Sequence, residues 1–66
     1  MSDDKTELQV EEVLKDSGQA LLCLFETGDE VWIPKSQIDD DSEVYEEGTT
    51  GTLIIPLWLA GKKGLV

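Results

Sequence analysis

Residues 6–15 carry apolar side chains with a period of two that changes phase midway. These side chains are Leu8, Val10, Val13 and Leu14. A helix would gather the last three on one face, whereas a strand with a bulge near Glu11 would return Val13 to the inward side. We favour the bulged strand, because residues 16–19, Asp-Ser-Gly-Gln, are typical of a turn that leads into another strand.

Three further strands are predicted from apolar runs and β-branching. Residues 20–25 are apolar at every position, which indicates a strand covered on both faces. Gly28 suits the positive φ of a tight hairpin, so residues 30–33 are expected to return beside this strand until Pro34 ends the pairing. Residues 52–55 form the last predicted strand.

Two short helical elements are expected to connect and close these strands. Residues 34–36 suit one helical or 3-10 turn, after which Ile38 returns to the core. Pro56 is tolerated at the start of a helix and Gly64 at its end, which predicts a short C-terminal helix. The expected fold is mainly β: a small open barrel or curled antiparallel sheet, SH3-like or OB-like, of four to five strands with that helix.

A chain of 66 residues is long enough for one domain only. We expect residues 1–5 to be disordered and residues 6–66 to form a single small β-rich domain. With one cysteine and no histidine, the chain cannot build an internal disulfide or a structural zinc site. Packing of apolar side chains must therefore provide the stability, and Cys23, which lies in an apolar run, is expected to be buried and reduced.

The charge bears most directly on function. Fifteen acidic residues and five lysines give a net charge of −10. Such a chain repels phosphate groups, which disfavours direct binding to nucleic acid or to an anionic membrane. No secretion signal and no membrane-spanning apolar run is evident, so a cytoplasmic protein is expected. A partner attracted by this charge would present a basic surface.

The first candidate site is the acidic loop, residues 39–47. Its candidate partner-binding carboxylates are Asp39, Asp40, Asp41, Glu43, Glu46 and Glu47. A calcium loop that starts at Asp39 would need glycine where Val44 stands and glutamate where Thr50 stands, so no metal or other cofactor is expected. We predict a solvated loop, with room for a short edge strand near residues 43–46.

The second candidate site is aromatic. Trp32 and Tyr45 are candidate partner-binding residues that, with Trp58, could clasp an extended peptide. The apolar runs around the tryptophans favour the core for Trp58 and leave Trp32 open between core and surface. Catalysis is not expected, because the chain has no histidine to activate a nucleophile and a barrel this small has little room for a carboxylate pair in a pocket.

Two segments resemble a set of small bacterial and bacteriophage proteins of unassigned function. The first reads Glu-Val-Trp-Ile-Pro-Lys-Ser-Gln-Ile at residues 30–38 and continues through residues 40–44; the second reads Trp-Leu-Ala at residues 58–60 and Lys-Lys-Gly-Leu at residues 62–65. The resemblance covers residues 20–66, although Leu57 stands where such proteins often have an acidic residue. It implies a phage or mobile-element setting and no catalytic residues.

Three functional hypotheses follow. The leading one is a non-enzymatic acidic protein-interaction module that binds a basic surface on a nucleic-acid-handling protein, in its sharpest form as a DNA-mimic inhibitor. The second is a module that binds a peptide or small ligand in an aromatic groove. The third is an accessory domain that self-associates as a homodimer. Salt dependence separates the first from the second, because charge-driven binding weakens as ionic strength rises.

Overall fold

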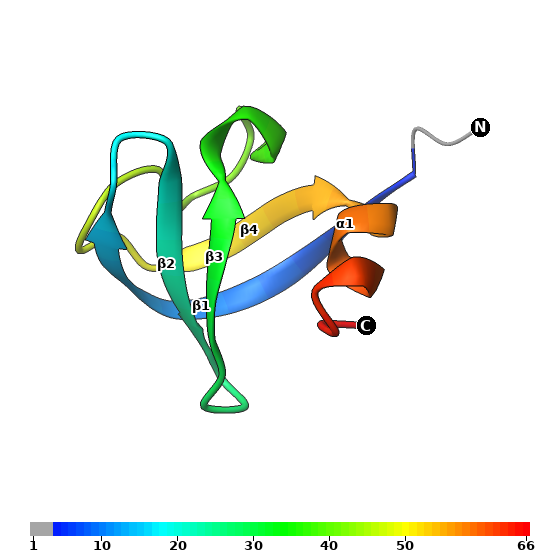
Figure 1. Cartoon of the computed structure of the whole chain (residues 1–66), viewed down its shortest axis with the longest axis horizontal. Coiled ribbons are helices and arrows are strands. Elements are labelled where there is room, and N and C mark those ends of the chain that lie inside the picture. The colour runs from blue at the N-terminus through cyan, green and yellow to red at the C-terminus, as the bar shows by residue number, and fades with distance from the viewer. Residues whose placement is uncertain (1–3) are drawn as a thin grey trace.

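The computed structural model describes residues 4–66 as one curled antiparallel sheet with a helix beside its open side. The elements in chain order are β1 (Lys5–Asp16), β2 (Ala20–Phe25), β3 (Glu30–Pro34), the 3-10 turn η1 (Lys35–Gln37), β4 (Gly51–Pro56) and α1 (Leu57–Lys62). The strand order is β3-β2-β1-β4, so β3 and β4 form the two edges of an open sheet. Figure 1 shows β2 and β3 crossing β1 and β4 steeply, so that the sheet folds over itself. The mainly β prediction is confirmed.

β1 bends because it pairs with two different neighbours in succession. Its first half pairs with β4 and its second half with β2, and Val10 belongs to both ladders. The register with β2 shifts after Val10 and again after Val13. A bulge bends a strand and increases its twist, which allows one strand to serve both halves of the curled sheet. The predicted bulge near Glu11 is therefore confirmed, and the helical alternative for this segment is wrong.

The core lies inside the curl of the sheet and beneath α1. Its buried side chains are Val10, Val13, Leu21, Cys23, Phe25, Ile33, Val44, Leu53, Ile55, Leu59 and Ala60. Cys23 is buried as predicted, and desolvation raises the pKa of its thiol to about 11. Ile38 and Leu65 pack against this cluster from its margin. No charged or polar residue among those described is buried with it.

β2 differs from the prediction in how its second face is covered. Leu21, Cys23 and Phe25 point into the core, whereas the alternate residues, including Leu22 and Leu24, are only half-buried. The principal contacts of β2 are with β1, β3 and η1, so no second layer of described elements lies over this outer face. The expectation of a strand fully covered on both faces is therefore wrong.

Both ends of the described chain are tied to the body. The backbone N–H of Leu57 donates to the carbonyl of Asp4 at 2.9 Å, and Lys5 is already part of β1. Of the segment predicted to be disordered, residues 1–3 lie outside the described residues. At the other end, Gly64 has φ +76° and Leu65 N–H donates to the Ala60 carbonyl at 2.8 Å, so α1 ends in a Schellman motif at the predicted glycine.

Candidate functional site

The first part of the acidic loop lies along the outer edge of β4. The N–H of Asp39 donates to the Ile54 carbonyl at 2.9 Å, and the N–H of Glu43 donates to the Thr52 carbonyl at 2.8 Å. In return, the Ser42 hydroxyl oxygen accepts the N–H of Ile54 at 2.8 Å, and Glu43 Oε1 accepts the N–H of Thr52 at 2.9 Å. Thr52 and Ile54, which turn away from β1, therefore have their N–H and C=O groups satisfied, and Pro56, the third outward residue of β4, has no N–H to offer. This edge is closed to further pairing along Thr52 and Ile54.

The short edge strand predicted near residues 43–46 is absent, and loop side chains bind the edge of β4 in its place. No strand forms there; residues 43–46 are irregular. Side chains take the place of ladder hydrogen bonds, because the carboxylate of Glu43 and the hydroxyl of Ser42 accept the N–H groups that a paired strand would bind. Glu43, predicted to bind a partner, therefore has a structural role in holding the loop to the sheet.

The second part of the acidic loop is anchored by one apolar side chain and by β1. Val44 is fully buried, whereas the adjacent Tyr45 is 64% exposed. Thr49 Oγ1 donates to the Glu46 carbonyl at 2.6 Å and accepts the N–H of Tyr45 at 3.2 Å. The N–H of Val13 in turn donates to the Thr49 carbonyl at 2.9 Å. The loop is thus held at both ends, on β4 and on β1.

The carboxylates of the acidic loop fall into two groups. Asp39 binds Lys5 and accepts the N–H of Asp41 at 2.9 Å. The hydrogen bond from Lys5, and after it that from Asp41, holds the pKa of Asp39 below its usual value. Four further carboxylates, on exposed residues, make no ion pair within the part of the chain that the structure describes: those of Asp40, Asp41, Glu46 and Glu47.

Replacing Lys5 with glutamine is expected to raise the pKa of Asp39 toward its usual 3.8. Because the folded state lowers this pKa, the stabilisation is present above about pH 4 and is lost as the pH falls through the folded value. Carboxyl NMR titration of Asp39 measures the change. The matched control is Lys63→Gln, which removes the same charge from the far end of the chain and should leave Asp39 unaffected. An unchanged pKa of Asp39 in the Lys5→Gln protein would show that this ion pair does not form.

The structure does not gather the aromatic side chains into one groove. A groove beside η1 is lined by Leu21, Lys35, Ile38, Asp39, Asp40, Ser42, Val44 and Tyr45, and neither tryptophan contributes to it. Trp32 is 41% exposed on β3, and Trp58 is 55% exposed on α1. The prediction of a buried Trp58 is wrong, because Leu59 and Ala60 already fill the inward face of this short helix.

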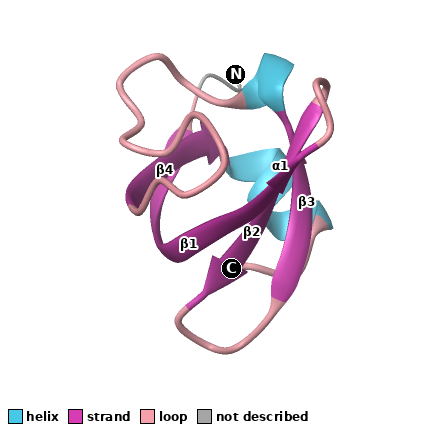
Figure 2. Cartoon of the chain, turned by 90° about the vertical axis from the view of Figure 1, so that its left-hand side faces the viewer, coloured by secondary structure: helices cyan, strands magenta, loops and turns pink. Residues whose placement is uncertain are grey.

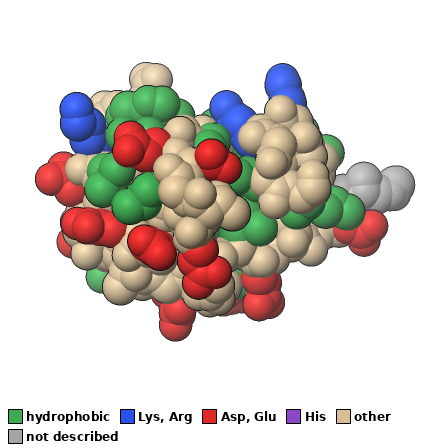
Figure 3. Space-filling view, turned by 90° about the horizontal axis from the view of Figure 1, so that it is seen from below, with side chains coloured by type: hydrophobic (Ala, Val, Ile, Leu, Met, Phe, Trp, Pro, Cys, Tyr) green, Lys and Arg blue, Asp and Glu red, His purple; other side chains and the backbone are tan. Residues whose placement is uncertain are grey.

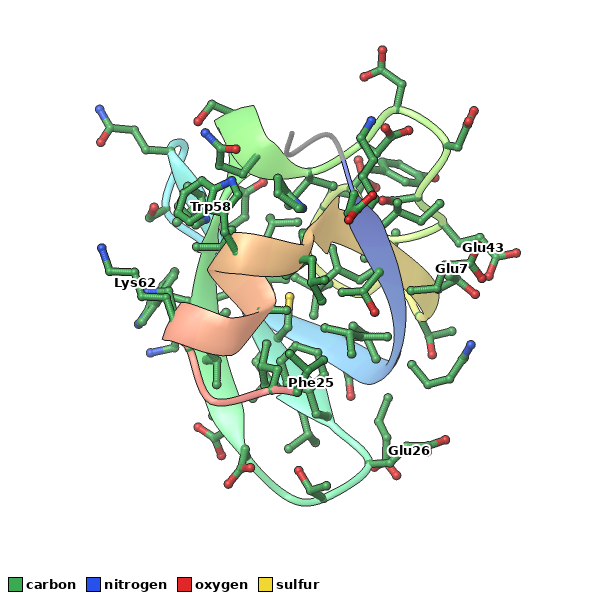
Figure 4. All side chains as sticks on the ribbon, turned by 90° about the vertical axis from the view of Figure 1, so that its right-hand side faces the viewer. Glu7, Phe25, Glu26, Glu43, Trp58 and Lys62 are labelled. Carbon is green, nitrogen blue, oxygen red and sulfur yellow. The ribbon has the colours of Figure 1, made fainter. Side chains whose placement is uncertain are left out.

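The acidic surface extends beyond the loop. Figure 3 shows acidic side chains spread over the face seen from below, with lysines only toward its upper border. Figure 4 places Glu7 and Glu43 on one side of the molecule and Lys62 on the other. Glu7 is paired in register with Ile54, whose backbone binds the acidic loop. The sequence alone gave no sign that Glu7 would lie near the loop, because their proximity comes from the β1–β4 register.

No protein-family model, curated protein or solved structure matches the chain. Within residues 4–66, no group of three or more potential metal-ligating side chains lies together. Among the helices that the structure describes, none has the length and apolar character needed to cross a membrane. In Figure 2 the long loop between η1 and β4, which contains the acidic loop, extends beside β4, and the β2–β3 hairpin loop lies at the opposite end. The acidic loop is the principal candidate site.

Proposed function

We propose that this protein is a non-enzymatic interaction module whose acidic loop binds a basic surface on a partner protein. The observation that carries the proposal is a set of four exposed carboxylates that make no ion pair among residues 4–66, on a loop fixed at both ends: Asp40, Asp41, Glu46 and Glu47. Basic surfaces of this kind are typical of proteins that handle nucleic acid. A cytoplasmic partner of that class, in a phage or mobile-element setting, agrees with the resemblance of the two sequence segments.

Two physical effects favour such binding. A net charge of −10 speeds the encounter with a basic protein by electrostatic steering. The hydrogen bonds from Glu43 to Thr52 and from Val13 to Thr49 hold the loop in place before the partner arrives, so less conformational entropy is lost on binding. In the most specific version of this function, the loop competes with DNA for the partner's phosphate-binding residues and so acts as a DNA-mimic inhibitor.

Neutralising the four free carboxylates together is expected to weaken binding to a decalysine peptide by about tenfold, equivalent to about 1.4 kcal/mol. The variant carries Asp40→Asn, Asp41→Asn, Glu46→Gln and Glu47→Gln, and it leaves Asp39 and Glu43 in place because they hold the loop. Binding is measured by amide chemical shifts from about 0.01 M to about 0.15 M salt, over which the Debye length falls from about 30 Å to about 8 Å. Shifts in the unchanged protein should concentrate in residues 40–47.

The matched control removes four charges elsewhere on the molecule. It carries Asp3→Asn, Asp4→Asn, Glu11→Gln and Glu12→Gln, all outside the acidic loop and the β2–β3 hairpin in the sequence, so its net charge equals that of the loop variant. We expect the control to keep most of the affinity. Equal losses in the two variants would mean that only net charge matters and that the loop is not a site. If the affinity did not change with salt concentration, the exposed aromatic residues would be favoured as the binding site instead.

A further inference from the structure

β3 forms the second edge of the sheet, and its pairing shows which of its backbone groups face outward. The N–H of Lys35, just after β3, donates to the carbonyl of Gln19 at 2.8 Å. Hydrogen-bonded and non-hydrogen-bonded pairs alternate along an antiparallel ladder. Counting back from Lys35 in steps of two, Ile33 and Val31 are the β3 residues that hydrogen-bond to β2, opposite Leu21 and Cys23.

Glu30, Trp32 and Pro34 consequently turn their backbone groups away from β2. Pro34 has no N–H to leave unpaired there, which is why proline is tolerated on an edge strand. Among the described residues, no loop or turn backbone hydrogen bond reaches Glu30 or Trp32. At β4 the corresponding groups of Thr52 and Ile54 are satisfied by the acidic loop. One edge of the sheet is therefore closed and the other is open.

The surroundings of the open edge indicate the chemistry of an occupant. Trp32 is 41% exposed and lies directly opposite the half-buried Leu22, which offers an apolar contact beside the edge. The hairpin end carries exposed acidic residues without an ion pair in the described structure: Glu26, Asp29 and Glu30. Figure 4 shows Glu26 at the β2–β3 hairpin, at the end of the molecule away from η1. A peptide segment added beside β3 would thus contact the apolar side chains of Trp32 and Leu22 and, further along, the acidic residues of the hairpin.

We propose that the open edge of β3 accepts an extended basic segment of a partner protein as a fifth strand. Its backbone would hydrogen-bond to Glu30 and Trp32, an apolar side chain would pack on Trp32 and Leu22, and a lysine or arginine would lie near Asp29. A second copy of the chain fits less well. Symmetric pairing about Trp32 would set Pro34, which has no donor, opposite Glu30, and each copy has a net charge of −10. This surface is separate from the acidic loop.

The test uses a capped peptide of sequence Thr-Val-Thr-Val-Lys-Lys and a control peptide with glutamate in place of both lysines. Trp32→Pro removes the outward N–H without touching the ladder bonds of Val31 and Ile33, and Trp32→Val keeps that N–H while removing the ring. We expect the lysine peptide to bind the Trp32→Pro protein about tenfold more weakly than the Trp32→Val protein, an effect of about 1.4 kcal/mol. The glutamate peptide should bind more weakly than the lysine peptide.

Hydrogen exchange of the unchanged protein provides a second measurement that does not depend on how the proline variant folds. Without peptide, the amides of Glu30 and Trp32 should exchange much faster than those of Val31 and Ile33, and the lysine peptide should slow them. Slow exchange in the free protein would overturn the proposal, because the edge would already be covered. Protection that rises with protein concentration alone would assign the edge to a second copy. Peptide shifts confined to residues 40–47 would reject this surface and leave the acidic loop as the site.

Discussion

Replacing Gly51 with alanine is expected to lower the free energy of unfolding by about 3 kcal/mol, the sum of backbone strain and a lost hydrogen bond. Gly51 has φ +129°, a conformation that residues with a side chain rarely adopt. A Cβ atom there would clash with Glu43 Oε1 and lie 3.0 Å from Glu43 Cβ. Since Glu43 Oε1 accepts the N–H of Thr52, moving this carboxylate aside also opens the edge of β4.

The matched control is Gly61→Ala in α1. Gly61 has no positive φ, and beyond its own helix backbone a Cβ there would meet no atom of the described residues within 4 Å. Alanine should raise the stability by about 0.5–1 kcal/mol, because glycine is the poorer helix former. Urea unfolding followed by tryptophan fluorescence measures both changes. A loss below about 1 kcal/mol in the Gly51→Ala protein would show that Glu43 can leave its place at little cost, contrary to a structural role for it.

The strands could be predicted because local chemistry decided them. The apolar run Ala20–Phe25 became β2 with its predicted bounds, Gly28 has the positive φ of the hairpin, and Pro34 ends β3. The phase change at Glu11 became a bulge in β1. Each of these features depends on residues close together in the sequence, where backbone preferences act directly.

The roles within the candidate site could not be predicted, because they depend on pairing between distant segments. Nothing near Glu43 in the sequence shows that its carboxylate binds the N–H of Thr52, and nothing near Asp39 shows its contact with Lys5. The exposure of Trp58 likewise depends on which residues of α1 meet the sheet. The six carboxylates of the acidic loop look alike in the sequence, but in the structure two of them hold the loop and four face solvent.

Raising the pH from about 9 to about 11 is expected to reduce the free energy of unfolding by about 2 kcal/mol through Cys23 alone, at 1.36 kcal/mol for each pKa unit. Burial raises the pKa of the Cys23 thiol from 9.0 to about 11, because the core does not solvate a thiolate. A group whose pKa is raised on folding contributes stability that is complete below its unfolded pKa. That contribution disappears as the pH rises to the folded value, since the unfolded chain then loses its proton first.

Tyrosine and lysine side chains also titrate in this range, so the comparison is with a Cys23→Ala protein. This variant lacks the thiol and should be less stable at neutral pH because its smaller side chain leaves a cavity in the core. Urea unfolding at several pH values should show a steeper alkaline loss in the unchanged protein, so that the difference in stability between the two proteins shrinks by about 2 kcal/mol as the pH rises to the folded pKa. If the stabilities of the two proteins fell with pH in parallel, the thiolate would be as well solvated in the folded protein as in the unfolded chain. The core around Cys23 would then admit water, and the inward face of β2, the strand between β1 and β3, would not be sealed from solvent.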